Sequence, residues 1–147
     1  MLFSTNRMPN EGENTAIGRN VSFNPQNITA SQHMFFCERK SQDEYIEIGN
    51  DSFFTKLSKD RDCKQILLFI HGFNNRMEDG AFQKAIDLQK LLDRNAGLGE
   101  DYVRVIPLIW PCDDDGTFAK LDDYYDDRST ANISAEAFAR MLGKFDT

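Results

Sequence analysis

An unbroken apolar run, from Ile66 to Ile70, constrains the fold of this chain more than any other feature of its sequence. A strand with one face in solvent alternates apolar and polar side chains. A strand covered on both faces, as in a parallel sheet, has apolar residues at successive positions. The run follows Gln65 and leads directly into His71 and Gly72. We therefore expect Gln65 to Ile70 to form a strand in the middle of a sheet.

The residues after this strand have the spacing of a helix and then of a second strand. The segment from Asp79 to Asn95 carries an apolar stripe at helical positions, formed by Ala81, Ala85, Leu88 and Leu92 and widened by Phe82 and Ile86. Gly97 fits the end of that helix. The next apolar segment, Tyr102 to Trp110, begins about 38 residues after the first, which agrees with a βαβ crossover.

A last helix is predicted from Ala131 to Phe145, with Asn132 or Ser129 as its N-cap. Its narrow apolar face consists of Ala135, Phe138, Ala139 and Leu142. Pro107 is unusual in a central strand because proline cannot donate to a sheet ladder. We expect a bulge there, or a strand whose outer half is unpaired.

The N-terminal part of the chain predicts an antiparallel hairpin after a polar arm. Leu2 to Arg7 could form a short strand, and the polar residues that follow predict a long loop with at most a brief strand at Val21 to Phe23. Residues 33–38 are apolar and residues 44–49 alternate, so the two segments form a hairpin at a sheet edge. Asn50 or Asp51 could then cap a single amphipathic turn.

This order of elements, an antiparallel start followed by strand, helix, strand and helix, predicts an α/β fold with a mostly parallel sheet. The length of 147 residues suits one domain. We expect residues 1–147 to form part of a single domain, with a loop-rich arm at 1–32 and the hairpin and β-α-β-α unit at 33–147.

Composition excludes several classes of function. A net charge of −7 argues against a nucleic-acid partner, which requires a basic face. The longest apolar run is far shorter than the roughly 20 residues that span a membrane, and the N-terminus lacks the features of a secretion signal. Cys37, Cys63 and Cys112 are widely spaced and odd in number. They predict reduced structural thiols in a cytoplasmic protein rather than a disulfide framework or a metal knuckle.

The His-Gly turn after the apolar strand suits acyl-transfer chemistry. A backbone N–H that points into a cleft at the carboxyl end of a strand can stabilise the oxyanion of a tetrahedral intermediate. Here the sequence resembles the α/β-hydrolase superfamily, in a branch of unassigned substrate. The similarity rests on the order and spacing of STNR at 4–7, FIHGFNN at 69–75, WP at 110–111 and YYDDRSTANISA at 124–135.

The resemblance implies a role for several residues. It assigns the oxyanion N–H to Phe73 and the tight turn to Gly72, and it gives His71 and Asn74 the task of holding the loop. We favour a structural histidine over a general base at His71. Further along the chain, Trp110 and Pro111 could line the rim of a substrate pocket, although plain packing is favoured, and Asp126 with Arg128 would form a local ion pair.

The serine nucleophile of this superfamily lies in a G-x-S-x-G elbow, followed by an acid and then a histidine. None of the eight serines of this chain lies between such glycines: Ser4, Ser22, Ser31, Ser41, Ser52, Ser58, Ser129 and Ser134. We therefore expect an N-terminal portion of an α/β-hydrolase fold that lacks nucleophile, acid and base. The complete form would cleave small carboxylic esters or amides without a cofactor or metal, and this chain alone would be inactive.

Two other functions fit parts of the sequence. Asp113 and Asp115, in the stretch DDDGT, resemble the phosphotransfer motif of Mg²⁺-dependent phosphatases of the haloacid-dehalogenase type. A solvated acidic loop is the favoured interpretation of that stretch. Alternatively, the chain is a non-catalytic binding or oligomerisation module, because an incomplete sheet exposes an edge through which copies of the chain could associate.

Overall fold

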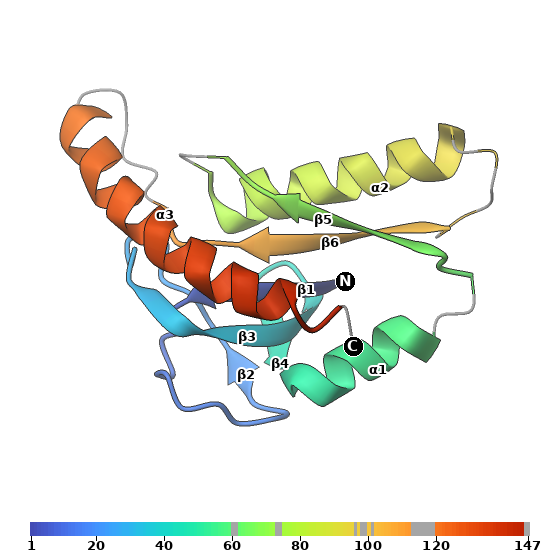
Figure 1. Cartoon of the computed structure of the whole chain (residues 1–147), viewed down its shortest axis with the longest axis horizontal. Coiled ribbons are helices and arrows are strands. Elements are labelled where there is room, and N and C mark those ends of the chain that lie inside the picture. Colours follow the sequence, from blue (N-terminus) through green and yellow to red (C-terminus); the bar gives the residue numbers. More distant parts are fainter. Residues whose placement is uncertain are drawn as a thin grey trace.

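The computed structural model describes residues 1–59, 62–72, 75–95, 97, 100, 102–112 and 120–145, with the backbone alone at 120–127. A six-stranded sheet with the order β2-β4-β3-β1-β6-β5 forms its centre (Figure 1). The strands are β1 (Leu2–Arg7), β2 (Asn20–Val21), β3 (Ala30–Ser41), β4 (Glu44–Glu47), β5 (Gln65–Ile70) and β6 (Val103–Ile109). The helices are α1 (Gly49–Lys59), the π-helix η1 (Met77–Phe82), α2 (Gln83–Asn95) and α3 (Lys120–Leu142).

The sheet has a parallel half and an antiparallel half. The strands β1, β6 and β5 run parallel, so their carboxyl ends lie along one edge. The strand β3 pairs antiparallel with both β1 and β4, and the short strand β2 pairs antiparallel with β4. The predicted hairpin of residues 33–49 is therefore confirmed, as is the α/β class. The hairpin lies beside the sheet edge, which is formed by β2.

Helices cover both faces of the sheet. On one face, α1 and α3 pack on β3, and the core contains Phe36, Phe53, Ile106, Leu108 and Met141. On the other face, η1 brings Ala81 and Phe82 against Phe3, Phe35 and Tyr45, and α2 continues along β6. Neighbouring residues of one strand, such as Phe35 and Phe36, contribute to opposite cores, as the period of two along a strand requires.

The arm 1–32 is more ordered than its polar composition predicts. Leu2–Arg7 is a fully buried interior strand between β3 and β6. Thr5 donates its hydroxyl to the carbonyl of Ile109 at 2.7 Å, and Asn6 binds Ser134 of α3 at 2.9 Å. Short-range signals in the sequence do not show these long-range hydrogen bonds. The predicted brief strand is present as β2, one residue earlier than expected.

The position predicted for Gln65–Ile70 is wrong. The strand is present, but it lies at the end of the sheet rather than in the middle. Its apolar side chains are accordingly only partly covered, and Ile70 is 53% exposed. Within the part of the chain that the structure describes, β6 is the strand that pairs with β5.

Two helices differ from their predicted form. Residues 49–59 form α1, an 11-residue helix rather than a single turn, because Phe53 and Leu57 bury a full face against the sheet. The last helix begins at Lys120, so the caps predicted at Ser129 and Asn132 are wrong. Its buried face consists of Thr130, Ser134, Ala137, Phe138 and Met141, whereas Ala135, Ala139 and Leu142 are exposed.

Pro107 is accommodated without a bulge. The β5–β6 ladder runs in constant register from Gln65 opposite Val103 to Ile70 opposite Leu108. The ladder between β1 and β6 is confined to Ser4 opposite Leu108 and Thr5 opposite Ile109, both beyond the proline. Pro107 has no backbone N–H to donate, which agrees with the short pairing between β6 and β1.

Phe82 should be a major contributor to the stability of the η1 side of the sheet. Its ring is fully buried, contacts Phe3 edge-on with centroids 4.9 Å apart and lies under the guanidinium of Arg39 at 5.4 Å. Phe82→Ala should lower the free energy of unfolding by about 3–5 kcal/mol. Leu91→Ala, on the same helical segment but 57% exposed, should change it by less than about 0.5 kcal/mol. Urea denaturation measures both, and equal losses would contradict this account of the core.

Candidate functional site

The predicted oxyanion turn lies at the carboxyl edge of the parallel half of the sheet. His71 and Gly72 directly follow β5, Arg7 is the last residue of β1, and Trp110 to Cys112 continue from β6. Phe73 and Asn74, the predicted N–H donor and one of its supports, lie outside the residues that the structure describes. The site is therefore described through the residues that flank them.

His71 clamps the end of β5 to the end of β6. Its side chain is buried, and its ring stacks on that of Trp110 with centroids 5.4 Å apart and an interplanar angle of 4°. The backbone N–H of Trp110 donates to His71 Nε2 at 3.1 Å, and the indole N–H of Trp110 donates to the carbonyl of His71 at 2.9 Å. The two residues are 39 positions apart in the chain.

The hydrogen bonds of His71 select one tautomer. With the proton on Nδ1, that nitrogen donates to the carbonyl of Gly72 at 2.9 Å while Nε2 accepts from Trp110. The other tautomer would aim Nε2–H at the carbonyl of Trp110, 3.1 Å away, but would turn the Nδ1 lone pair toward the oxygen of Gly72. Both ring nitrogens are thus engaged within the protein, which supports a structural role over that of a general base.

Burial lowers the pKa of His71 below its ordinary value. The backbone carbonyls of Gly72 and Trp110, which can each accept a ring N–H, act in the opposite direction, and the charges of Arg7 and Lys84 reinforce the lowering. The ring is therefore neutral at pH 7. A neutral ring suits the contact between His71 and Trp110, because the imidazolium would have no lone pair to accept the N–H of Trp110.

Asn75 closes the turn, and sequence reasoning missed this residue. Its side-chain amide donates to the carbonyl of Gly72 at 3.0 Å, and its Oδ1 accepts from Lys84 of α2. The thiol of Cys112 donates to its backbone carbonyl at 3.4 Å. The signal in the sequence was the pair of asparagines at 74 and 75, of which only the first was given a supporting role.

A close approach to Asn75 favours glycine at position 80 and not at position 72. A Cβ on Gly80 would lie 3.1 Å from Oδ1 and 3.3 Å from Cβ of Asn75. At Gly72 the nearest atom to an added Cβ would be Nδ2 of Asn75, at an ordinary 3.9 Å. Among the described residues, the turn therefore gives no steric reason for glycine at 72, whereas the packing of the loop on η1 does so at 80.

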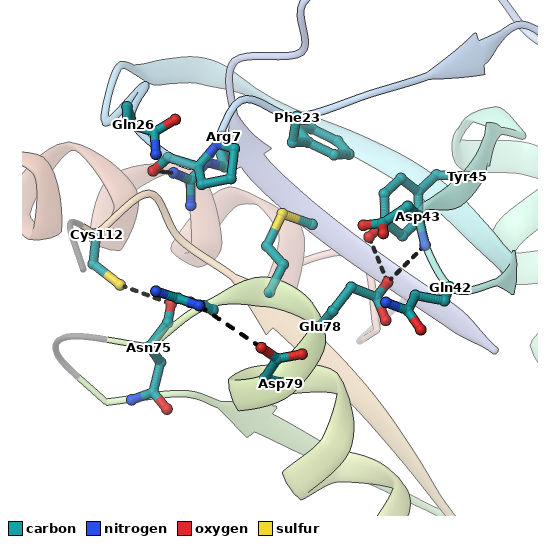
Figure 2. Close-up of a pocket in the computed structure, with 13 residues that line it drawn as sticks. Arg7, Phe23, Gln26, Gln42, Asp43, Tyr45, Asn75, Glu78, Asp79 and Cys112 are labelled. Atoms are coloured by element: carbon teal, nitrogen blue, oxygen red, sulfur yellow. Dashed lines mark hydrogen bonds and ion pairs between the residues drawn. The ribbon is translucent and has the colours of Figure 1, made fainter. Parts of the chain in front are cut away.

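The sequence suggested that Trp110 and Pro111 could line the rim of a pocket. In the structure the residue that follows them, Cys112, lines a pocket instead. Trp110 and Pro111 are themselves buried, and Trp110 packs in the core with α3, as the favoured packing interpretation required. A cavity of about 500 Å³ opens next to Cys112 and Asn75. Its lining also includes Arg7, Phe23, Tyr45, Met77 and Glu78 (Figure 2).

Glu78 fixes one wall of this pocket. Arg39 donates to both of its carboxylate oxygens, with a shortest N–O distance of 2.6 Å, and the hydroxyl of Tyr45 donates to the same group. Burial acts to raise the pKa of Glu78, but the hydrogen bonds from Arg39 and Tyr45 outweigh it and lower the pKa below its ordinary value. The first turn of η1 is thereby attached to the β3–β4 hairpin as a carboxylate.

Several predicted residues lie outside the described structure. They include Asp113 and Asp115 of the phosphatase-like stretch and the side chain of Asp126, the predicted partner of the exposed Arg128. In the described part of the chain, no group of three or more histidine, cysteine or acidic residues could hold a metal ion. The helices described are also too short or too polar to cross a membrane.

The lowered pKa of His71 should make stability depend on pH. The unfolded chain takes up a proton near pH 6.5, whereas the folded protein resists protonation until a lower pH, so the free energy of unfolding should fall as pH drops below about 6.5. In the His33→Asn variant His71 is the sole histidine, so NMR titration of its ring protons measures the folded pKa directly. A value at or above 6.5 would contradict the burial argument.

The comparisons with known proteins identify the family of the chain. A family model described as an alpha/beta hydrolase of unknown function (DUF900) matches residues 48–147, which include β5, η1, α2, β6 and α3. No curated protein matches the chain, and no solved structure does. The chain therefore belongs to this family of α/β hydrolases of unknown function.

Proposed function

We propose that this chain supplies the oxyanion half of a serine hydrolase that cleaves small carboxylic esters or amides. The observation that supports the proposal is the pair of contacts that flank the predicted turn: His71 binds Trp110 at the carboxyl edge of the parallel strands, and Asn75 binds the carbonyl of Gly72 next to a cavity of about 500 Å³. Such edges are where α/β sheets bind ligands. A cavity of this size suits a small molecule.

Within this proposal, the N–H of Phe73 donates to the oxyanion, Gly72 forms the turn, and His71 and Asn74 support it. Asn75 joins them, because it ties the carbonyl of Gly72 to η1. A donor held by such a framework needs no reorganisation when charge develops on the substrate, and this is the source of its catalytic value.

The nucleophile, acid and base would come from residues other than the serines of this chain. None of the eight lies in a G-x-S-x-G elbow, and none is among the described residues that line the pocket. Several of them have structural partners instead: for example, Ser4 donates to the sulfur of Met141, and Ser134 exchanges hydrogen bonds with Asn6. The chain taken alone should therefore not form an acyl-enzyme.

A reducing compartment, such as the cytoplasm, fits the cysteines. Cys37, Cys63 and Cys112 are all thiols, and two of them are buried. Burial is the first cause that raises the pKa of Cys37 far above its ordinary value, so this thiol is unreactive. In this proposal the role of all three cysteines is packing.

The oxyanion donor can be tested by removing its hydrogen. In the protein expressed from its complete reading frame, Phe73→Pro deletes the N–H and should lower kcat for p-nitrophenyl butyrate by roughly 10²–10³-fold. Phe73→Ala keeps the N–H and should retain most of kcat. In the 147-residue chain, where Trp110 is the single tryptophan, its emission reports whether the contact between His71 and Trp110 has survived each change.

A serine-directed fluorophosphonate should abolish the same activity. Equal losses in Phe73→Pro and Phe73→Ala, with Trp110 emission unchanged, would rule out the proposed donor. Absence of hydrolysis across short acyl esters and anilides would count against the hydrolase proposal and favour the second candidate function below.

The second candidate is self-association through β5, favoured by the exposure of this strand. From Ile66 to Ile70 the edge carries no charge, and Ile66, Leu67 and Ile70 are exposed. An uncharged apolar edge strand pairs readily with another strand. Two copies related by a two-fold axis could join their β5 strands antiparallel and extend the sheet through both molecules.

Leu67→Lys should weaken this association, because a lysine on the edge opposes strand pairing. Ile17→Lys places the same charge on another exposed apolar residue, far from β5 in the sequence, and should leave the association unchanged. Sedimentation velocity over a concentration series measures both. If the unaltered protein is a monodisperse monomer throughout the micromolar range, this candidate function fails.

A further inference from the structure

The carbonyl of Gly72 accepts two hydrogen bonds from side chains. The ring of His71 donates to it from Nδ1 at 2.9 Å, and the side-chain amide of Asn75 donates to it at 3.0 Å. A carbonyl oxygen has two lone pairs, so both of its acceptor positions are used. This carbonyl belongs to the same peptide group as the N–H of Phe73, the proposed oxyanion donor.

Contacts at the carbonyl of a peptide group also affect its N–H. In a planar trans peptide group the C=O and N–H bonds point in opposite directions, so a contact that orients the carbonyl also orients the N–H. Donors at the carbonyl polarise the group, and hydrogen bonds in series strengthen one another by about 10–30% per bond. The donors to Gly72 therefore bear on both the direction and the strength of the N–H that follows it.

Lys84 selects which end of the Asn75 amide meets this carbonyl. Its ammonium group, on α2, donates to Oδ1 of Asn75. A lysine ammonium can only donate, so the amide atom that faces it is the oxygen, and the NH₂ group is left for Gly72. Without the ammonium, the amide could rotate by half a turn and place Oδ1 against the carbonyl of Gly72, where two acceptors would repel each other.

The surroundings of Asn75 hold it in the position that this contact needs. Gly80 of η1 lies directly against its side chain, because a Cβ added there would be 3.1 Å from Oδ1. Figure 2 shows the carbonyl of Asn75 facing Cys112, whose thiol donates to it at 3.4 Å, and the side chain pointing the other way. Asn75 is thus held at its backbone and at its side chain, and a change at Lys84 acts on Gly72 through the amide.

We propose that Lys84 is a positioning residue for the oxyanion donor: through Asn75 it sets the direction and the donor strength of the N–H of Phe73. This inference rests on the proposed function, because it concerns the donor of the same site. Lys84 acts by hydrogen bonds alone, and no proton is transferred between the groups. Its effect should be strongest when negative charge develops on the substrate oxygen, because only then does the N–H face a full oxyanion.

The polarisation of this peptide group can be measured without turnover, which separates the inference from the hydrolase proposal. A donor at a carbonyl deshields its ¹³C′ nucleus and the amide ¹⁵N nucleus of the same peptide group. NMR spectra of the labelled 147-residue chain give both signals, ¹³C′ of Gly72 and ¹⁵N of Phe73. Asn75→Asp keeps the shape of the side chain and an oxygen for Lys84 but removes the donor, so both signals should move to lower chemical shift. Lys84→Met should move them in the same direction by a smaller amount.

Lys90→Met is the matched control for the loss of charge. Lys90 lies on the same helix, and its ammonium is 3.9 Å from the carboxylate of Asp87, with both side chains exposed. The control removes the same charge from α2 and should leave the two signals where they are. Lys84→Arg keeps a cation that can only donate and should retain most of the original chemical shifts.

Kinetics supply a second measurement. In the protein expressed from its complete reading frame, Lys84→Met should lower kcat for p-nitrophenyl butyrate by roughly two- to tenfold, the effect of weakening one hydrogen bond. KM should change little, because the lost interaction belongs to the transition state rather than to the bound substrate. Asn75→Asp should lower kcat at least as much, and Lys90→Met should leave it unchanged.

The side chain of Lys84 is exposed, so Lys84→Met should fold and decide the matter even if Asn75→Asp does not. Unchanged signals of Gly72 and Phe73 in Lys84→Met would overturn the inference. Equal displacement of these signals in Lys90→Met would do the same, because it would show a response to net charge alone. A raised KM with kcat unaltered would also contradict it. Displaced signals in a protein without hydrolase activity would support the role of Lys84 at this peptide group and contradict only the proposed function.

Discussion

The hydrogen bonds between His71 and Trp110 fix the direction in which the chain leaves β5, and the rest of the site depends on this constraint. Both residues are buried, so each unmade hydrogen bond would leave a polar group without water, at a cost of about 1–3 kcal/mol. The two bonds join the ends of adjacent parallel strands. The carbonyl of Gly72 is then held by the ring of His71, and Asn75 attaches the same carbonyl to η1. Gly72 and Asn75, the described residues on either side of the predicted turn, are thereby tied to the β5–β6 framework and to η1.

The start of η1 is held from the opposite side by the antiparallel half of the sheet. Arg39 on β3 and Tyr45 on β4 bind Glu78, while Phe82, one turn later, packs on Phe3 of β1. The π-helical turn lets Glu78 face the hairpin and Phe82 face the core within six residues. The pocket is therefore bounded by the hairpin, by the end of β1 and by η1, each of which is fixed by contacts with the others. Such walls keep their positions without a ligand, and a site formed in advance loses little entropy on binding.

The local sequence pattern predicted the helices and strands of this fold well. It predicted their burial and their partners in the fold less well. The strands at Gln65–Ile70 and Val103–Ile109, the helix that ends at Asn95 and the hairpin follow from periodicity and from turn residues. The interior position of Leu2–Arg7 could not be predicted, because it depends on partners more than 100 residues away, such as Ile109 and Ser134. The buried face of α3 was misjudged because alanines are compatible with either side of a helix, whereas the hydrogen bond from Asn6 to Ser134 selects one. The role of Asn75 depends on Gly80 and Lys84, which lie beyond any short motif.

The two edges of the sheet differ in how well they are protected against pairing with another chain, and the difference lies in their sequences. The outer strand β2 is two residues long and offers little ladder to another chain. At the other edge, β5 has six residues, and Ile66 to Ile70 contain neither the lysine nor the proline that commonly protects an edge. The unbroken apolar pattern that predicted a central strand is the same property that leaves Ile66, Leu67 and Ile70 exposed at the edge. Because the turn and its pocket continue directly from β5, a polypeptide that pairs with this edge would extend the sheet beside the site and would have its own strand ends next to Gly72.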